Sequence, residues 1–127
     1  MSLTVRPGFS QSAEPTGAPI PVPSGIAVHW LETLRDNQGP AGLTLRFRFV
    51  APEVADPDYD PDKAAADLQA LCDGYVLARV SEMGPQPAEL VLDLADQVVP
   101  FGEANEAAVQ YFEAYSIGDG ACVWEFY

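Results

Sequence analysis

Histidine and cysteine are scarce in this sequence of 127 residues, and their scarcity excludes several kinds of site. His29 is the only histidine, so no two imidazoles can share a metal, and any Ser-His or Cys-His dyad must be built around this residue. Two cysteines, Cys72 and Cys122, are too few for a zinc site made of cysteine alone. We expect no cofactor, and the sequence favours a protein without enzymatic activity.

Basic residues are also few. Six Lys and Arg stand against 19 Asp and Glu, which gives a formal charge of −13. Such a field repels phosphate backbones and anionic lipids, and no run approaches the roughly 20 apolar residues that span a bilayer. We therefore expect no nucleic-acid partner and no membrane insertion, and the partner remains an unknown protein or small molecule. Solubility is the simplest role of the acidity.

The first 24 residues are rich in proline and glycine, a composition that sustains neither a helix nor a central strand. We predict a disordered tail over residues 1–24 and a single α+β domain over residues 25–127. Ile20, Val22 and Ile26 are candidates to hold the end of the tail against the domain as an extended edge.

Apolar and polar residues alternate in several short segments, as in half-buried strands. The clearest is residues 43–50, and we expect residues 26–34 to pair with it as an antiparallel hairpin. Residues 90–94 predict a third strand, and Val98-Val99 a short fourth. Residues 111–117 and 121–126 predict a closing hairpin around Gly118-Asp119-Gly120. A helix over residues 108–115 is the competing interpretation.

One strong helix signal follows an acidic loop. Asp60 suits the N-cap, Pro61 the first helical position and Asp62 the first turn. Apolar residues then recur every three or four positions, which predicts a helix to about Met83, and residues 103–108 suggest one further helical turn. The fold class is α+β, an antiparallel β-sheet of four to six strands packed against one main α-helix.

Two groups of charged residues are candidate binding sites. Arg46 and Arg48 share one strand face and, with His29, could bind an anion or small molecule, although cross-strand ion pairs with Asp93, Glu113 or Glu125 are the ordinary alternative. Alternating carboxylates resemble part of a calcium loop, but the glycine and glutamate of an EF-hand are replaced by Pro61 and Asp67. Weak calcium binding is the lesser hypothesis beside helix capping. The four carboxylates are Asp56, Asp58, Asp60 and Asp62.

The two cysteines permit one disulfide. The helical pattern places Cys72 on the apolar stripe, and the strand pattern turns Cys122 toward the core. A bridge would close a loop of about 51 residues and stabilise the fold by roughly 4 kcal/mol in the chain-entropy model. Two buried free thiols are the alternative.

Five strings resemble a small family of uncharacterised bacterial proteins with a domain of unknown function. They are Ile20-Pro21-Val22-Pro23-Ser24-Gly25, Leu45-Arg46-Phe47-Arg48-Phe49-Val50-Ala51-Pro52, Val99-Pro100-Phe101-Gly102, Gln110-Tyr111-Phe112-Glu113-Ala114-Tyr115 and Asp119-Gly120-Ala121-Cys122-Val123-Trp124-Glu125. The resemblance covers about residues 20–127 and implies export, which would favour the disulfide. Some members carry the label acetolactate synthase. That activity is implausible for this chain, because the Gly-Asp-Gly turn lacks the long downstream segment and Asn ligand of a thiamine diphosphate motif.

These observations give an unknown function with three ranked hypotheses. The first is a non-enzymatic binding or interaction domain of an exported bacterial protein. The second is a small-molecule or anion-binding protein, with an enzyme as one form of it, and the third is a weak calcium-binding module. Localisation is periplasmic or secreted if Met1-Ser2-Leu3 replaces a removed signal peptide, and otherwise cytoplasmic.

Overall fold

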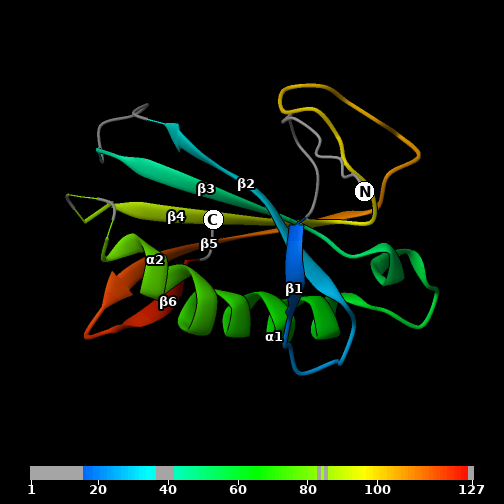
Figure 1. Ribbon diagram of the computed structural model, residues 1–127, viewed down its shortest axis with the longest axis horizontal. Coiled ribbons are helices and arrows are strands. Elements are labelled where there is room, and N and C mark those ends of the chain that lie inside the picture. Colours follow the sequence, from blue (N-terminus) through cyan, green and yellow to red (C-terminus); the bar gives the residue numbers. More distant parts are fainter. Residues whose placement is uncertain (1–15, 37–41, 83, 85, 126–127) are drawn as a thin grey trace, which may run out of the picture.

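The computed structural model describes residues 16–36, 42–82, 84 and 86–125. Six strands form one sheet in chain order, and a helical segment covers one of its faces (Figure 1). The strands are β1 (Thr16–Ile20), β2 (Val28–Asp36), β3 (Thr44–Val50), β4 (Glu89–Ala95), β5 (Gln110–Gly118) and β6 (Ala121–Glu125). A 3₁₀ turn, η1 (Pro52–Ala55), precedes the helix, which runs through α1 (Pro61–Ala70), the π-helical η2 (Leu71–Val76) and α2 (Leu77–Val80).

The sheet is mixed, which corrects the expected antiparallel arrangement. β3 and β4 pair in parallel, with Arg48 opposite Asp93, whereas every other neighbouring pair is antiparallel. The reason is the connection: the helix carries the chain back along the sheet after β3, so β4 starts at the same end, as a parallel pair requires. The predicted hairpin of β2 and β3 is confirmed.

The helix begins as predicted. Asp60 Oδ1 accepts a hydrogen bond from the backbone N–H of Lys63 at 2.9 Å, and Pro61 occupies the first turn. The helix ends at Val80, and the expected end at Met83 lies outside the described residues.

The core lies between the helix and the sheet face toward it. One face of β3 and β4 and the inner side of the helix supply its fully buried side chains, which include Leu45, Phe47, Leu68, Leu71 and Leu92. Burying a side chain of this size contributes roughly 1.5–3 kcal/mol. The period-two pattern of β3 correctly identifies its core residues, but Arg48 and Val50 on the opposite face are buried as well.

Two expectations about irregular segments are wrong. Thr16–Ile20, placed in the disordered tail, forms edge strand β1, where the missing N–H of Pro19 and the positive φ of Gly17 are tolerated; residues 1–15 lie outside the described residues. The segment 96–109 holds neither a strand at Val98-Val99 nor a helical turn at residues 103–108. It is a loop closed at its base, where Asp96 and Val109 exchange hydrogen bonds.

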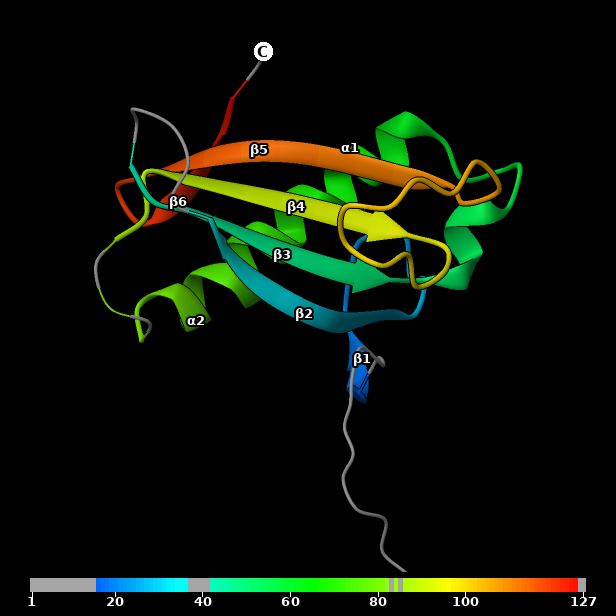
Figure 2. The same ribbon diagram turned by 90° about the horizontal axis from the view of Figure 1, so that it is seen from above.

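The closing hairpin is confirmed against the helical alternative for residues 108–115. β5 and β6 pair across Asp119 and Gly120, whose φ values of 54° and 79° are the positive pair that a tight two-residue turn requires. Figures 1 and 2 place the loop over residues 96–109 on the side of the sheet away from the helix. We call that side the helix-free face.

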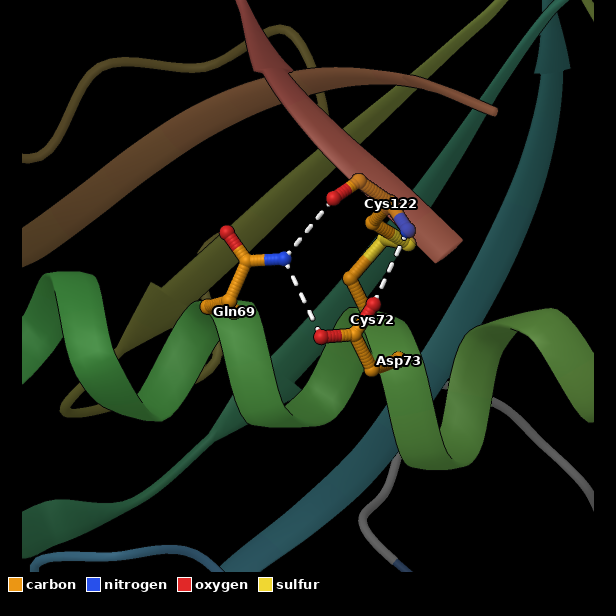
Figure 3. Close-up of a disulfide and its surroundings, with 4 residues drawn as sticks. All are labelled: Gln69, Cys72, Asp73 and Cys122. Carbon is orange, nitrogen blue, oxygen red and sulfur yellow. Dashed lines mark hydrogen bonds between the residues drawn. A yellow bond between two sulfur atoms is a disulfide. The ribbon is translucent and has the colours of Figure 1, made fainter. Parts of the chain in front are cut away.

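Cys72 and Cys122 connect the helix to β6, with their sulfur atoms 2.08 Å apart (Figure 3). Two side chains of the helix bind the backbone at the same point. Asp73 Oδ1 accepts from the N–H of Cys122 at 2.9 Å, and Gln69 Nε2 donates to its carbonyl at 3.0 Å. The covalent link and these hydrogen bonds together hold β6 to the helix.

We expect the disulfide to be a major part of the stability. Replacing both cysteines with alanine should lower the free energy of unfolding by roughly 4 kcal/mol, because the unfolded chain regains the entropy of the opened loop. Denaturant titration measures this loss in the double variant, and the same titration of wild type before and after reduction should give a similar difference. Wild type denatured without reductant should show no reactive thiols, and two reactive thiols would contradict the bridge.

Candidate functional site

A mostly buried group of charged side chains lies at the centre of the helix-free face, with Glu32 half-buried beside Arg48 and Asp93. Arg48 is only 4% exposed, and its place in β3 sets it opposite Glu32 of β2 and Asp93 of β4. Its guanidinium forms ion pairs with both carboxylates, at 3.3 Å from Nε to Asp93 Oδ2, and also donates to the carbonyl of Val99. Arg48 therefore joins three strands and the loop after β4.

Asp93 is incompletely satisfied within this group. Its Oδ1 atom is buried and has no hydrogen-bond partner among the described residues. Burial raises the pKa of Asp93, and the hydrogen bond and charge of Arg48, with the charge of Arg46, offset only part of that increase. The folded protein thus favours the protonated form of Asp93 more than an unfolded chain does.

Arg46 lies beside this group, and its Nε atom is buried without a hydrogen-bond partner among the described residues. The guanidinium carbons of Arg46 and Arg48 lie 5.4 and 5.9 Å from the ring centre of Phe101. That distance permits a cation–π interaction, so an aromatic ring of the loop covers both arginines.

The predicted group of Arg46, Arg48 and His29 is brought together only in part. The two arginines share a face, but all three guanidinium nitrogens of Arg48 already donate hydrogen bonds within the chain. His29 pairs in register with Val50, whereas Arg46 pairs with Leu34. Along β3, Val50 and Arg46 are four positions apart, or about 13 Å. An anion-binding role would therefore depend on Arg46.

The acidic loop before the helix uses its carboxylates locally. Asp56 Oδ1 accepts from the N–H of Asp58 at 2.8 Å, and Asp60 caps the helix. Lys63 Nζ donates to the carbonyl of Asp58 at 2.9 Å. Among the described residues, no three His, Cys, Asp or Glu side chains gather closely enough to bind a metal ion. Asp62, the fourth predicted ligand, is exposed in the first turn of α1.

Asp67 is a buried polar residue that the sequence did not single out. It is 0% exposed, and its carboxylate accepts hydrogen bonds from Ser24 N–H (2.9 Å), Ser24 Oγ (2.6 Å) and Tyr59 Oη (2.8 Å). Asp67 lies between buried Ala64 and Leu71 on the helix, and this position on the apolar side was the available signal.

A cavity of about 450 Å³ adjoins this carboxylate. It lies between the chain after β1, the η1 turn with the acidic loop, and the start of α1. Its walls are formed by Pro23, Ser24, Ile26, Glu53, Asp56, Asp58, Tyr59, Lys63, Ala66 and Asp67. The site thus combines a buried carboxylate, three exposed carboxylates and several apolar wall residues.

The whole sequence was compared with known proteins and families. Residues 6–127 match the family described as "Family of unknown function (DUF6497)". The chain belongs to this family. No curated protein and no solved structure matches the chain.

Membership in DUF6497 confirms the expected family of unknown function and assigns no activity. Bacterial origin and export stay predictions, and the match says nothing of the acetolactate synthase label that we judge implausible for this chain. Within the described part of the chain, no helix has the length and apolar character needed to cross a membrane.

Removing the positive charge of Arg48 should strongly destabilise the folded state. The change Arg48→Met leaves Glu32 and Asp93 without their partner and should lower the free energy of unfolding by about 3–5 kcal/mol. The control Arg46→Met removes the same charge from the same strand face, but only a cation–π contact worth about 0.5–1 kcal/mol. Urea denaturation measures both, and equal losses would contradict the assigned role of Arg48.

The raised pKa of Asp93 predicts a particular pH dependence. Because the folded state binds the proton more tightly, the contribution of Asp93 to stability is full below its unfolded pKa. It is lost as pH rises toward the folded value. The change Asp93→Asn keeps the side chain neutral, so the stability of wild type relative to this variant should fall as pH rises above about 4. Denaturation at a series of pH values tests the sign, and a rising difference would contradict it.

Proposed function

We propose that this protein is a non-enzymatic interaction domain that binds a basic partner protein through the helix-free face of its sheet. The observation that carries the proposal is the exposure of large apolar side chains on that face. Phe101, Phe112 and Val123 are 57%, 53% and 47% exposed. Phe112 stands opposite Asp93 in the sheet, and Val123 stands opposite Ser116, which shares the face of Phe112.

The exposure of these apolar side chains is unusual for a sheet face that contacts only water. The solvent face of an antiparallel sheet normally carries polar residues, and several large apolar side chains exposed on one face are typical of an interaction site. The buried charges of Arg48 and its partners occupy the centre of this face. They hold the strands and the loop together, so that the apolar side chains sit on a rigid support.

Charge supports a basic partner rather than a second copy. Each chain carries a formal charge of −13, so two copies repel at long range, whereas a basic surface is attracted and associates faster. On the same face, the carboxylate of Glu125 accepts from Ser116 Oγ at 2.6 Å and forms no ion pair with a described residue. It is available to a cation at the edge of the apolar patch.

We also propose that the domain acts outside the cytoplasm. The Cys72–Cys122 link supports this, because disulfides persist in oxidising compartments and are reduced in most cytosols.

Site-specific photo-crosslinking tests the interaction face. The photoreactive analogue p-benzoylphenylalanine replaces Phe112 in one variant and exposed Ala78 of α2 in a matched control, and both are expressed in the source cells. We expect an adduct with a basic protein from position 112 and none from position 78. Equal adducts from both positions, or none from position 112, would count against the proposal.

The purified partner then gives a quantitative check. The double change Phe101→Ser and Phe112→Ser should weaken its binding at least tenfold, as expected for apolar side chains buried at an interface centre. Ala78→Ser should leave affinity unchanged, and added salt should slow association. An unchanged affinity in the double variant would reject this face as the binding surface.

A further inference from the structure

The cavity beside Asp67 lies on the helical side of the molecule, away from the proposed interaction face. We propose that it binds a small organic cation, namely a primary amine carried on an aliphatic stem. The inference is independent of the proposed partner protein. It rests on a buried carboxylate without a counter-ion and on the chemistry of the walls around it.

The carboxylate of Asp67 is fully buried and forms no ion pair with any described residue. Three hydrogen bonds compensate part of its lost hydration, but their donors, Ser24 and Tyr59, are uncharged. A buried charge is normally paired, because desolvating it costs several kcal/mol. Since Asp67 also lines the cavity, a cation there would gain from a charge that has no counter-ion among the described residues.

Tyr59 keeps that charge in place. Burial raises the pKa of its phenol first, and the hydrogen bond to Asp67 raises it further. The phenol therefore stays protonated and donates to Asp67 Oδ2 at 2.8 Å. Tyr59 also contacts Tyr111 edge to face, with ring centres 5.7 Å apart, which fixes the donor.

The walls of the cavity combine acidic and apolar side chains. Glu53, Asp56 and Asp58 are exposed and form no ion pair with a described residue. Pro23, Ile26 and Ala66 add apolar surface to the same walls. Carboxylates beside apolar surface suit a ligand with a cationic head and an alkyl stem, and a cavity of about 450 Å³ is ample for one.

The chain's own lysine shows that these walls accept an ammonium group. Lys63 Nζ binds the carbonyl of Asp58 at 2.9 Å and forms no ion pair with a carboxylate of the described chain. The lining residues thus hold four carboxylates and one ammonium. The start of α1 adds a positive end equivalent to about half a charge, too little to reverse the sign.

Titration with butylamine, followed by amide NMR shifts, tests this site in the full chain. We expect saturable shifts centred on Ser24, Asp58 and Lys63, and none with butanol or butyrate. The double change Asp56→Asn and Asp58→Asn retains the Asx hydrogen bond and should weaken binding at least fivefold. Lys63→Gln should strengthen binding about twofold or more, because it removes a competing ammonium.

Asp62→Asn is the matched control. It removes one negative charge from the first turn of α1, beside Lys63, at a residue that does not line the cavity. It should change affinity by less than twofold. If Asp62→Asn weakened amine binding as much as the double variant does, the binding would reflect only the overall negative charge of the protein. That result would overturn the proposal. Linear, unsaturated shifts would overturn it as well. Neither outcome bears on crosslinking from position 112.

Discussion

The parallel pairing of β3 with β4 is the constraint on which the other features depend. It requires a long crossover, and the helix that supplies it covers one face of the sheet and completes the core. The same pairing sets Arg48 directly across from Asp93, so a single register decides both the apolar core on one side and the buried ion pair on the other. A shift by one residue would exchange the two faces and place the arginine in the core.

The helix covers only one face of the sheet. The other face is covered in part by the loop and by side chains of the strands themselves. The loop over residues 96–109 folds across that face, and Arg48 fastens it through the carbonyl of Val99. Phe101 lies over the arginines and still leaves more than half of its surface in solvent. The charged centre therefore explains how the loop is anchored, and it does not explain the apolar groups around it. A partner does.

Much of the fold was predictable from local signals, and most of the site was not. Capping at Asp60, the alternation in β3 and the turn before Cys122 depend on near neighbours in sequence, and the structure confirms them. The order and direction of strands depend on long-range pairing, which periodicity does not encode. Glu32 was missed because a register irregularity after Trp30 changes which residue faces Arg48. Asp67 was missed because its partners come from segments 43 and 8 residues away.

The edges of the sheet explain why a partner would bind to the face of the sheet and not add a strand to it. Exposed edge strands invite pairing with another chain, and proteins commonly blunt them. β1 carries Pro19, which cannot donate, and its pairing with β2 is irregular. On β6, the N–H and carbonyl of Cys122 are already bound by Asp73 and Gln69, and the disulfide holds this strand against the helix. Strand addition is thus impeded at both edges, whereas Phe112 and its neighbours remain accessible on a face stiffened from within by buried ion pairs.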